Sequence, residues 1–184
     1  MTAHQAALEA LTRYFGYDSF RPGQQGIVEA LLAGRDVLGV DAHRRHGKSG
    51  RRLPDSRPLA VSPGMTLVIS PLISLMRDQV DALNDLGLPA AFINTTQTPD
   101  EQAMVFAQAA AGQIKLLYVA PERLETGRFR DFAARTPISL IAVDEAHCVS
   151  QWGQDFRSSY LGIGDFIAGL PQRPPVGAFT ATAT

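Results

Sequence analysis

The sequence predicts an α/β fold in which a parallel sheet carries helices on both faces. Three observations support this prediction. Short apolar runs typical of buried strands alternate with longer stretches in which apolar residues recur at helical spacing. Glycine, proline and capping residues separate these segments. The chain has 184 residues, 45% of them hydrophobic, which is enough for the core of one domain. We therefore expect residues 1–184 to form a single domain that binds ligands at the carboxyl ends of its strands.

The first elements are helical and lead into a strand. The stretch up to Gly16 predicts one helix, and a second is expected to begin at Pro22 and end at Gly34. Proline fits a first helical turn because the amide groups of that turn are unpaired, and glycine adopts the left-handed backbone that commonly ends a helix. The apolar run 36–40 then predicts a short buried strand.

Strands and helices alternate along the rest of the chain. Thr98, Pro99 and Glu101 form a predicted capping box, which begins a helix that runs to about Gly112. Another helix is predicted over 71–86. The further predicted strands are 65–70, 90–94, 115–120, 139–147 and 176–182. The strand 139–147 ends in acidic residues.

One interval contradicts this pattern. Residues 41–58 carry only two apolar side chains, and their two prolines would interrupt a helix at a cost of about 3 kcal/mol each. The interval instead holds five arginines and Lys48 against two aspartates. Yet the fold requires a buried helix between the strands 36–40 and 65–70.

Composition excludes several classes of protein. The single cysteine, Cys148, rules out an internal disulfide and a zinc site of several cysteines, and the four histidines show no metal-ligand spacing with it. The apolar stretches fall short of the ~20 residues that span a bilayer, and the amino terminus lacks the features of a signal peptide. We expect a cytoplasmic protein without a membrane partner. The net charge of −1 gives no general argument for nucleic-acid binding.

An acid pair follows the apolar run 139–143. Asp144 and Glu145, in Asp-Glu-Ala-His, would leave the end of a buried strand toward the ligand-binding edge of the sheet. In nucleotide hydrolases one such acid holds Mg²⁺ and the second orients or deprotonates the attacking water. The alternative is that the pair only caps the start of a helix, since four letters alone occur by chance in many chains.

A triplet typical of phosphate-binding loops follows the strand 36–40. Gly47, Lys48 and Ser49 lie at about the expected distance from that strand, with lysine for the β- and γ-phosphates and serine for Mg²⁺. The triplet alone is a weak indication. Together with the acid pair, which we expect on an adjacent strand, it favours a nucleoside triphosphatase.

Five segments carry a more specific pattern. They are FGYDSFRPGQ (15–24), SPLISLMRDQV (70–80), YVAPERL (118–124), AVDEAHCVSQWGQDFR (142–157) and FTATAT (179–184). In order and approximate spacing they resemble the first motor lobe of RecQ-type ATP-dependent DNA helicases. The resemblance implies a RecA-like P-loop NTPase lobe that uses ATP and Mg²⁺ and acts on DNA.

The resemblance also implies a role for each matching residue of the ATP site. The residues that bind ATP are then Arg21, Gln24, Gly47, Lys48, Ser49 and Asp144, of which the last two hold Mg²⁺. Arg21 and Gln24 would recognise adenine, since an amide can both donate to and accept from the base edge. Lys48 and Glu145 would be the catalytic residues. Without the resemblance, the segment around Gln24 would only start a helix.

Contacts with single-stranded DNA and duplex junctions are implied as well. The residues concerned are Ser70, Pro71, Trp152, Phe156 and Arg157. The first two begin the helix 71–86, whose amino terminus would face a phosphate. The other three belong to an aromatic-rich loop, where each ring would stack on a base for about 1 to 3 kcal/mol; alternatively, both rings fill a core. Gln154 stands where the family usually has histidine, so coupling of this loop to ATP hydrolysis does not carry over.

The phosphate loop departs from the family, which has approximately Met-Pro-Thr-Gly-Gly/Ala-Gly-Lys-Ser followed by Cys-Tyr-Gln-Ile-Pro-Ala-Leu. Here Arg45 and His46 stand at glycine positions, where left-handed geometry costs about 1 to 2 kcal/mol for each side chain. A shifted reading frame is one explanation. Asp41–Arg45 and Leu53–Pro58 can both be encoded so that a one-base shift gives Met-Pro-Thr-Gly-Ala and Tyr-Gln-Ile-Pro-Ala. An evolved basic patch that binds DNA is the other.

Two functions are therefore expected. The first is an ATP-dependent 3′ to 5′ DNA helicase motor lobe, acting on nucleoid DNA in recombination and repair. It would be active only with a second lobe that the resemblance places after Thr184. The second is a catalytically inactive fragment that retains DNA or partner binding.

Overall fold

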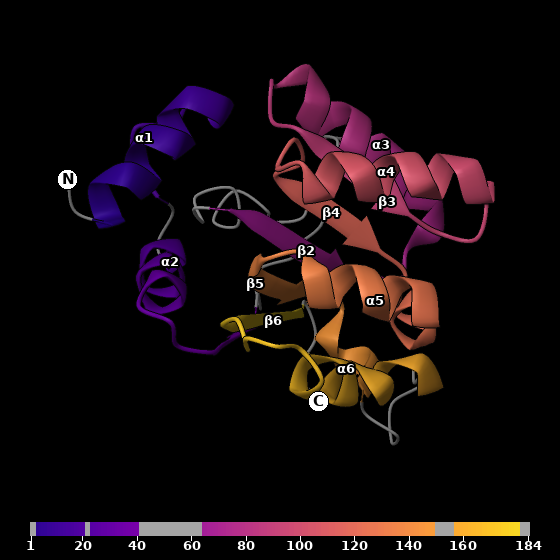
Figure 1. The fold of residues 1–184 in the computed structure, drawn as a ribbon. Coiled ribbons are helices and arrows are strands. Elements are labelled where there is room, and N and C mark those ends of the chain that lie inside the picture. Colours follow the sequence, from indigo (N-terminus) through magenta and orange to yellow (C-terminus); the bar gives the residue numbers. More distant parts are fainter. Residues whose placement is uncertain (1–2, 21–22, 41–63, 150–156, 181–184) are drawn as a thin grey trace.

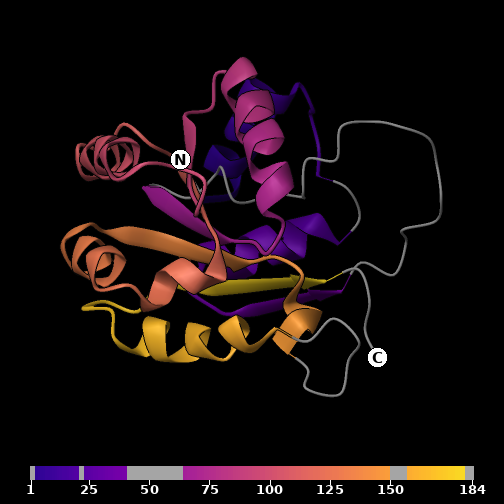
Figure 2. The ribbon, with the colours of Figure 1, turned by 90° about the vertical axis from the view of Figure 1, so that its right-hand side faces the viewer.

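The protein is built around a six-stranded parallel sheet with helices on both faces (Figures 1 and 2). The computed structural model describes residues 3–20, 23–40, 64–149 and 157–180. The strands follow the order β1-β6-β5-β2-β4-β3, and every pair is parallel. The predicted α/β class and the parallel sheet are confirmed.

Each predicted strand is present among the described residues. The strands are β1 (Val37–Val40), β2 (Met65–Ile69), β3 (Ala90–Ile93), β4 (Leu116–Val119), β5 (Ile138–Val143) and β6 (Val176–Thr180). The α-helices are α1 (Ala3–Phe15), α2 (Gln24–Leu32), α3 (Ile73–Asp85), α4 (Pro99–Ala110), α5 (Gly127–Arg135) and α6 (Gly162–Ala168). In the described part of the chain the short 3₁₀ helices are η2 (Pro121–Glu125), η3 (Ala146–Val149) and η4 (Ser158–Tyr160).

The helix starts differ from the predictions at two places. α2 begins at Gln24, two residues after Pro22, because Gly23 occupies the N-cap position with a left-handed φ of 87°. α3 begins at Ile73, so Ser70 and Pro71 precede this helix and do not form its first turn. Among the described helices, none combines the length and apolarity needed to cross a membrane.

The capping box at the start of α4 is confirmed. The backbone amide of Thr98 donates to Glu101 Oε2 at 2.7 Å, and the amide of Glu101 donates to Thr98 Oγ1 at 3.3 Å. The hydrogen bond from the Thr98 backbone lowers the pKa of Glu101 below its ordinary value. Gly34 ends α2 as predicted, with a φ of 75°. Its amide donates to the carbonyl of Leu31 at 3.0 Å.

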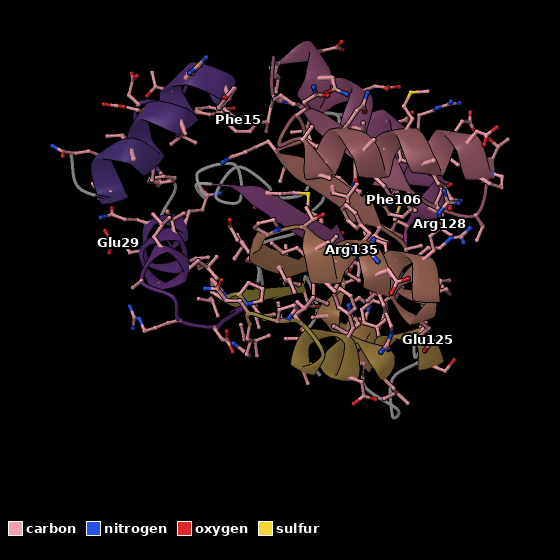
Figure 3. All side chains as sticks on the ribbon, viewed as in Figure 1. Phe15, Glu29, Phe106, Glu125, Arg128 and Arg135 are labelled. Atoms are coloured by element: carbon pink, nitrogen blue, oxygen red, sulfur yellow. The ribbon has the colours of Figure 1, made fainter. Side chains whose placement is uncertain are left out.

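Two hydrophobic cores lie on opposite faces of the sheet. One core joins the strands to α4, α5 and α6, and the other joins them to α1, α2 and α3. The first contains a cluster of aromatic rings, in which Phe129 and Phe132 have centroids 5.7 Å apart. Arg128 of α5 covers the edge of this cluster, with its guanidinium carbon 5.5 Å from the ring centroid of Phe106 in α4 (Figure 3). Cation–π contact of this kind adds to the packing of α4 on α5.

Truncation in the first core is expected to destabilise the fold. Leu67 in the central strand β2 is 0% exposed, so Leu67→Ala should lower the free energy of unfolding by about 2 to 5 kcal/mol through lost burial and a residual cavity. Leu38 in β1 is 70% exposed and serves as the control, with an expected loss under about 1 kcal/mol. Urea denaturation of the two variants measures the difference. Equal losses would show that this core does not dominate stability.

The strand order corrects one expectation. The strand that precedes Gly47 and the strand that precedes Asp144 are not adjacent, because β6 lies between β1 and β5. Which strands lie next to each other in a parallel sheet depends on pairing between distant segments, and the order of the strands along the chain does not reveal it. β6 packs tightly here: the ring of Phe179 lies 2.8 Å from the point where a Cβ on Gly39 of β1 would stand.

Candidate active site

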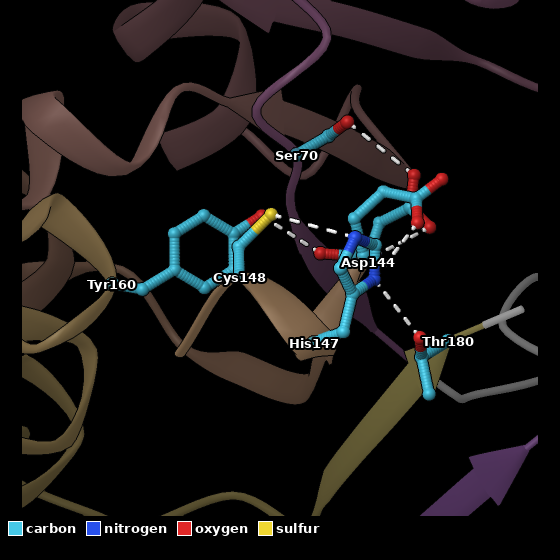
Figure 4. Close-up of polar contacts among 7 residues, drawn as sticks. Ser70, Asp144, His147, Cys148, Tyr160 and Thr180 are labelled. Atoms are coloured by element: carbon cyan, nitrogen blue, oxygen red, sulfur yellow. Dashed lines mark hydrogen bonds and ion pairs between the residues drawn. The ribbon is translucent and has the colours of Figure 1, made fainter. Parts of the chain in front are cut away.

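Polar side chains gather where β2, β5 and β6 end. Asp144 and Glu145 follow β5, Ser70 follows β2, and Thr180 is the last residue of β6 (Figure 4). The strands are parallel and adjacent in the order β6-β5-β2, so these ends share one edge of the sheet. This is the edge at which open α/β sheets bind their ligands. The predicted location of the acid pair is confirmed.

Hydrogen bonds of its backbone and of its carboxylate hold Asp144 in place. Its backbone amide donates to the carbonyl of Ile69 at 2.8 Å, which continues the pairing of β5 with β2 by one residue. Its Oδ1 accepts the amide of Glu145 at 2.9 Å, and its Oδ2 accepts the hydroxyl of Ser70 at 3.4 Å. The carboxylate therefore has a fixed direction before any ligand binds.

Glu145 has an unusual backbone. Its φ of 50° lies in the left-handed region, which costs a residue with a Cβ about 1 to 2 kcal/mol. Its side chain is 16% exposed, and its Oε2 lies 3.3 Å from Nδ1 of His147. The same nitrogen lies 3.0 Å from Oγ1 of Thr180. Imidazole thus connects the acid pair to the end of β6.

Tyr160 supports the acid pair from the core. Its hydroxyl donates to the backbone carbonyl of Asp144 at 2.8 Å, and its side chain is buried. Burial raises the pKa of this phenol above its ordinary value, and the charges of Cys148 and Asp144 add to the increase. The hydroxyl consequently stays protonated and available as a donor.

The described part of the site fits a magnesium nucleotide. The oxygens that could coordinate a metal are carboxylate and hydroxyl oxygens, the hard ligands that Mg²⁺ prefers. They come from Asp144, Glu145, Ser70 and Thr180. Both acids are partly exposed, so a ligand can reach them. Among the described residues, the 3₁₀ helix η3 follows the acid pair directly. A cavity of about 310 Å³ lies elsewhere, between the end of β3 and the first turns of α4 and α5.

Six predicted site residues lie outside the described part of the chain. They are Arg21, Gly47, Lys48, Ser49, Trp152 and Phe156. Gln24 is the first residue of α2 and is buried. Arg157 is exposed, as a DNA contact requires, and its amide donates to the carbonyl of Cys148 at 3.0 Å.

Ser70 and Pro71 are both buried. The Ser70 side chain faces Asp144, so it connects the predicted DNA-contacting segment to the acid pair and does not lie on the surface. Its direct contact with DNA stays a prediction for the segment, and the buried hydroxyl does not favour it.

Sequence reasoning missed the parts played by Thr180, His147 and Tyr160. The first two lie in FTATAT and Asp-Glu-Ala-His, which carry the resemblance to the helicase lobe, so that pattern was a usable indication. Tyr160 stands three residues after the last segment in that part of the chain, and nothing in its surroundings marks a hydrogen bond to Asp144.

Known proteins share this sequence pattern. Residues 21–184 match the family model described as DEAD/DEAH box helicase. The chain is 46% identical over 177 residues to the ATP-dependent DNA helicase RecQ of Haemophilus influenzae, with 96% of this chain and 28% of that protein covered. Identity to RecQ of Bacillus subtilis is 42% over 178 residues, with 97% and 30% covered. The chain therefore spans less than a third of these relatives.

The fold is shared as well. A hypothetical ATP-dependent RNA helicase from Sulfolobus tokodaii superposes with a TM-score of 0.64 at 19% identity, covering 97% of this chain and 50% of that one. The helicase Lhr of Mycobacterium smegmatis, bound to ssDNA and AMP-PNP, gives 0.62 at 14% identity, covering 97% and 24%. These likenesses confirm the RecA-like lobe fold. With the family model matched over residues 21–184, the chain belongs to the DEAD/DEAH box helicases, and its relatives support the resemblance to the RecQ type.

Proposed function

We propose that residues 1–184 are the ATP-binding lobe of a 3′ to 5′ DNA helicase that acts in recombination and repair together with a second motor lobe. One observation carries this proposal. β1, which precedes Gly47-Lys48-Ser49 in the sequence, and β5, which leads into Asp144 and Glu145, end at the same edge of the sheet, with β6 alone between them. Strands lie about 4.8 Å apart, so β1 and β5 are ~10 Å apart, a gap that a triphosphate and a lysine side chain can span.

Each group then has a task in hydrolysis. The loop around Lys48 binds the phosphates of ATP, and Arg21 and Gln24 bind its adenine. Ser49 and Asp144 would hold Mg²⁺, which would supply positive charge to the phosphates. Glu145 takes a proton from the water whose oxygen attacks the γ-phosphorus, while the bond from that phosphorus to the β-phosphate oxygen breaks.

DNA would bind beside this site. The bond between the Arg157 amide and the Cys148 carbonyl holds the end of the aromatic-rich loop against the residues that follow Glu145. Trp152, Phe156 and Arg157 would contact bases and phosphates of a single strand.

A second candidate function follows from the loop sequence. Arg45 and His46 stand where backbone amides must surround a phosphate, and their side chains would crowd it. The chain would then be a catalytically inactive lobe that retains contacts with DNA or with a protein partner.

Equilibrium binding by the purified chain separates the two functions. We expect weak binding of ATP and Mg²⁺ that Lys48→Ala removes, measurable binding of a single-stranded oligonucleotide, and no unwinding. DNA binding without any Lys48-dependent ATP binding would favour the inactive lobe. Efficient unwinding by residues 1–184 alone would contradict the need for a second lobe.

A further inference from the structure

The peptide bond between Asp144 and Glu145 is held at both ends. Its carbonyl, on Asp144, accepts the hydroxyl of Tyr160 at 2.8 Å. Its amide, on Glu145, donates to Oδ1 of Asp144 at 2.9 Å. Rotation of this peptide plane would break both bonds. The plane determines where the Glu145 side chain starts, so the two bonds together fix the point from which that side chain extends.

The conformation that these bonds hold is unfavourable by itself. Among the described residues other than glycine, only Glu145 has a positive φ, at 50°. A residue with a Cβ stays in the left-handed region only where its surroundings fix it. The hydroxyl of Tyr160 is an uncharged donor that lies outside the Asp-Glu-Ala-His segment. Its effect on the backbone of Glu145 can therefore be tested without changing either acid.

Tyr160 is itself well fixed. Its ring belongs to the hydrophobic core beneath α5 and α6 and is 2% exposed. Its amide donates to the carbonyl of Arg157 at 3.0 Å, and the amide of Arg157 donates to Cys148 at 3.0 Å. The amide of Cys148 in turn donates to the carbonyl of Glu145 at 2.9 Å. The hydroxyl thus completes a closed series of hydrogen bonds that begins at Glu145 and ends at Asp144.

We infer that Tyr160 is a positioning residue for ATP hydrolysis: its hydroxyl holds the Asp144–Glu145 peptide so that the Glu145 carboxylate faces the attacking water. The inference rests on the proposed function, in which Glu145 accepts the proton.

The variant Tyr160→Phe tests this by removing the hydroxyl and keeping the ring. Amide hydrogen exchange of residues 1–184, followed by NMR without nucleotide, should show faster exchange at Glu145 by roughly tenfold. The control is Tyr118→Phe, which removes a hydroxyl from a fully buried tyrosine in the core on the other face of the sheet. In this control, the exchange rate at Glu145, compared with the rates of amides in the core, should be the same as in the unchanged chain.

A kinetic arm separates positioning from general destabilisation. In the complete motor, Tyr160→Phe should lower kcat for ATP roughly 10- to 100-fold and leave KM within about twofold, because substrate still binds but the base is misplaced. The inference would be overturned if the amide of Glu145 exchanged at the same rate in Tyr160→Phe as in the unchanged chain. A kcat equal to that of the unchanged motor would overturn it as well. A motor without any ATP turnover would count against the proposed function and leave the exchange result to decide on Tyr160.

Discussion

Restoring small residues around Lys48 is expected to raise the affinity of the chain for ATP and Mg²⁺ by roughly 30- to 1,000-fold. The change replaces Ala42–His46 with Met-Pro-Thr-Gly-Gly and Arg51–Arg57 with Cys-Tyr-Gln-Ile-Pro-Ala-Leu, which keeps the length of the chain. The range follows from the strain of about 1 to 2 kcal/mol that Arg45 and His46 would each bear at glycine positions. Calorimetric titration with ATP and Mg²⁺ measures the effect.

Two controls accompany the loop replacement. Lys48→Ala in the restored chain should abolish the gain, because no other described or predicted group supplies an ammonium to the phosphates. Replacement of Arg51–Arg57 alone should restore the buried helix without the glycines, and it should leave affinity nearly unchanged. An original chain that already binds ATP as tightly as the restored one would show that Arg45 and His46 are compatible with a phosphate loop. Sequencing the gene decides independently whether the shifted reading frame exists.

Glu145→Gln is expected to reduce ATP turnover by about 10²- to 10⁴-fold in a motor that joins the restored lobe to a second lobe. The amide has nearly the shape of the carboxylate but cannot accept a proton, so ATP affinity should stay within about twofold. Steady-state hydrolysis with single-stranded DNA gives kcat, and titration with a non-hydrolysable analogue gives affinity. Glu9→Gln, at an exposed position in α1, is the matched control. Comparable turnover by the two variants would remove Glu145 from its proposed role.

Most of the sheet was predictable because its strands carry local information. The strand β2 is a run of five buried residues, and the buried run of β5 ends where the acids begin. The helices α5 and α6 escaped prediction for the opposite reason. α5 has nine residues, three of them arginines, and its apolar face becomes visible only when Phe129 and Phe132 are seen in the core.

The site was predictable in composition but not in its connections. Asp144 and Glu145 lie where the pattern of an apolar run followed by acids predicts them. The position of β6 between β1 and β5 was not predictable, because contacts between distant parts of the chain determine which strands are neighbours. Tyr160 reaches Asp144 through that same long-range packing, so no local spacing indicates it.

The most direct test of the central claim is a crystal structure of the restored lobe with Mg²⁺ and a non-hydrolysable ATP analogue. The account predicts the ammonium of Lys48 within about 3 Å of a β- or γ-phosphate oxygen, with the Asp144 and Glu145 carboxylates on the other side of the same triphosphate. A structure in which Lys48 points to solvent or across the sheet, with no nucleotide between it and Asp144, would contradict the account.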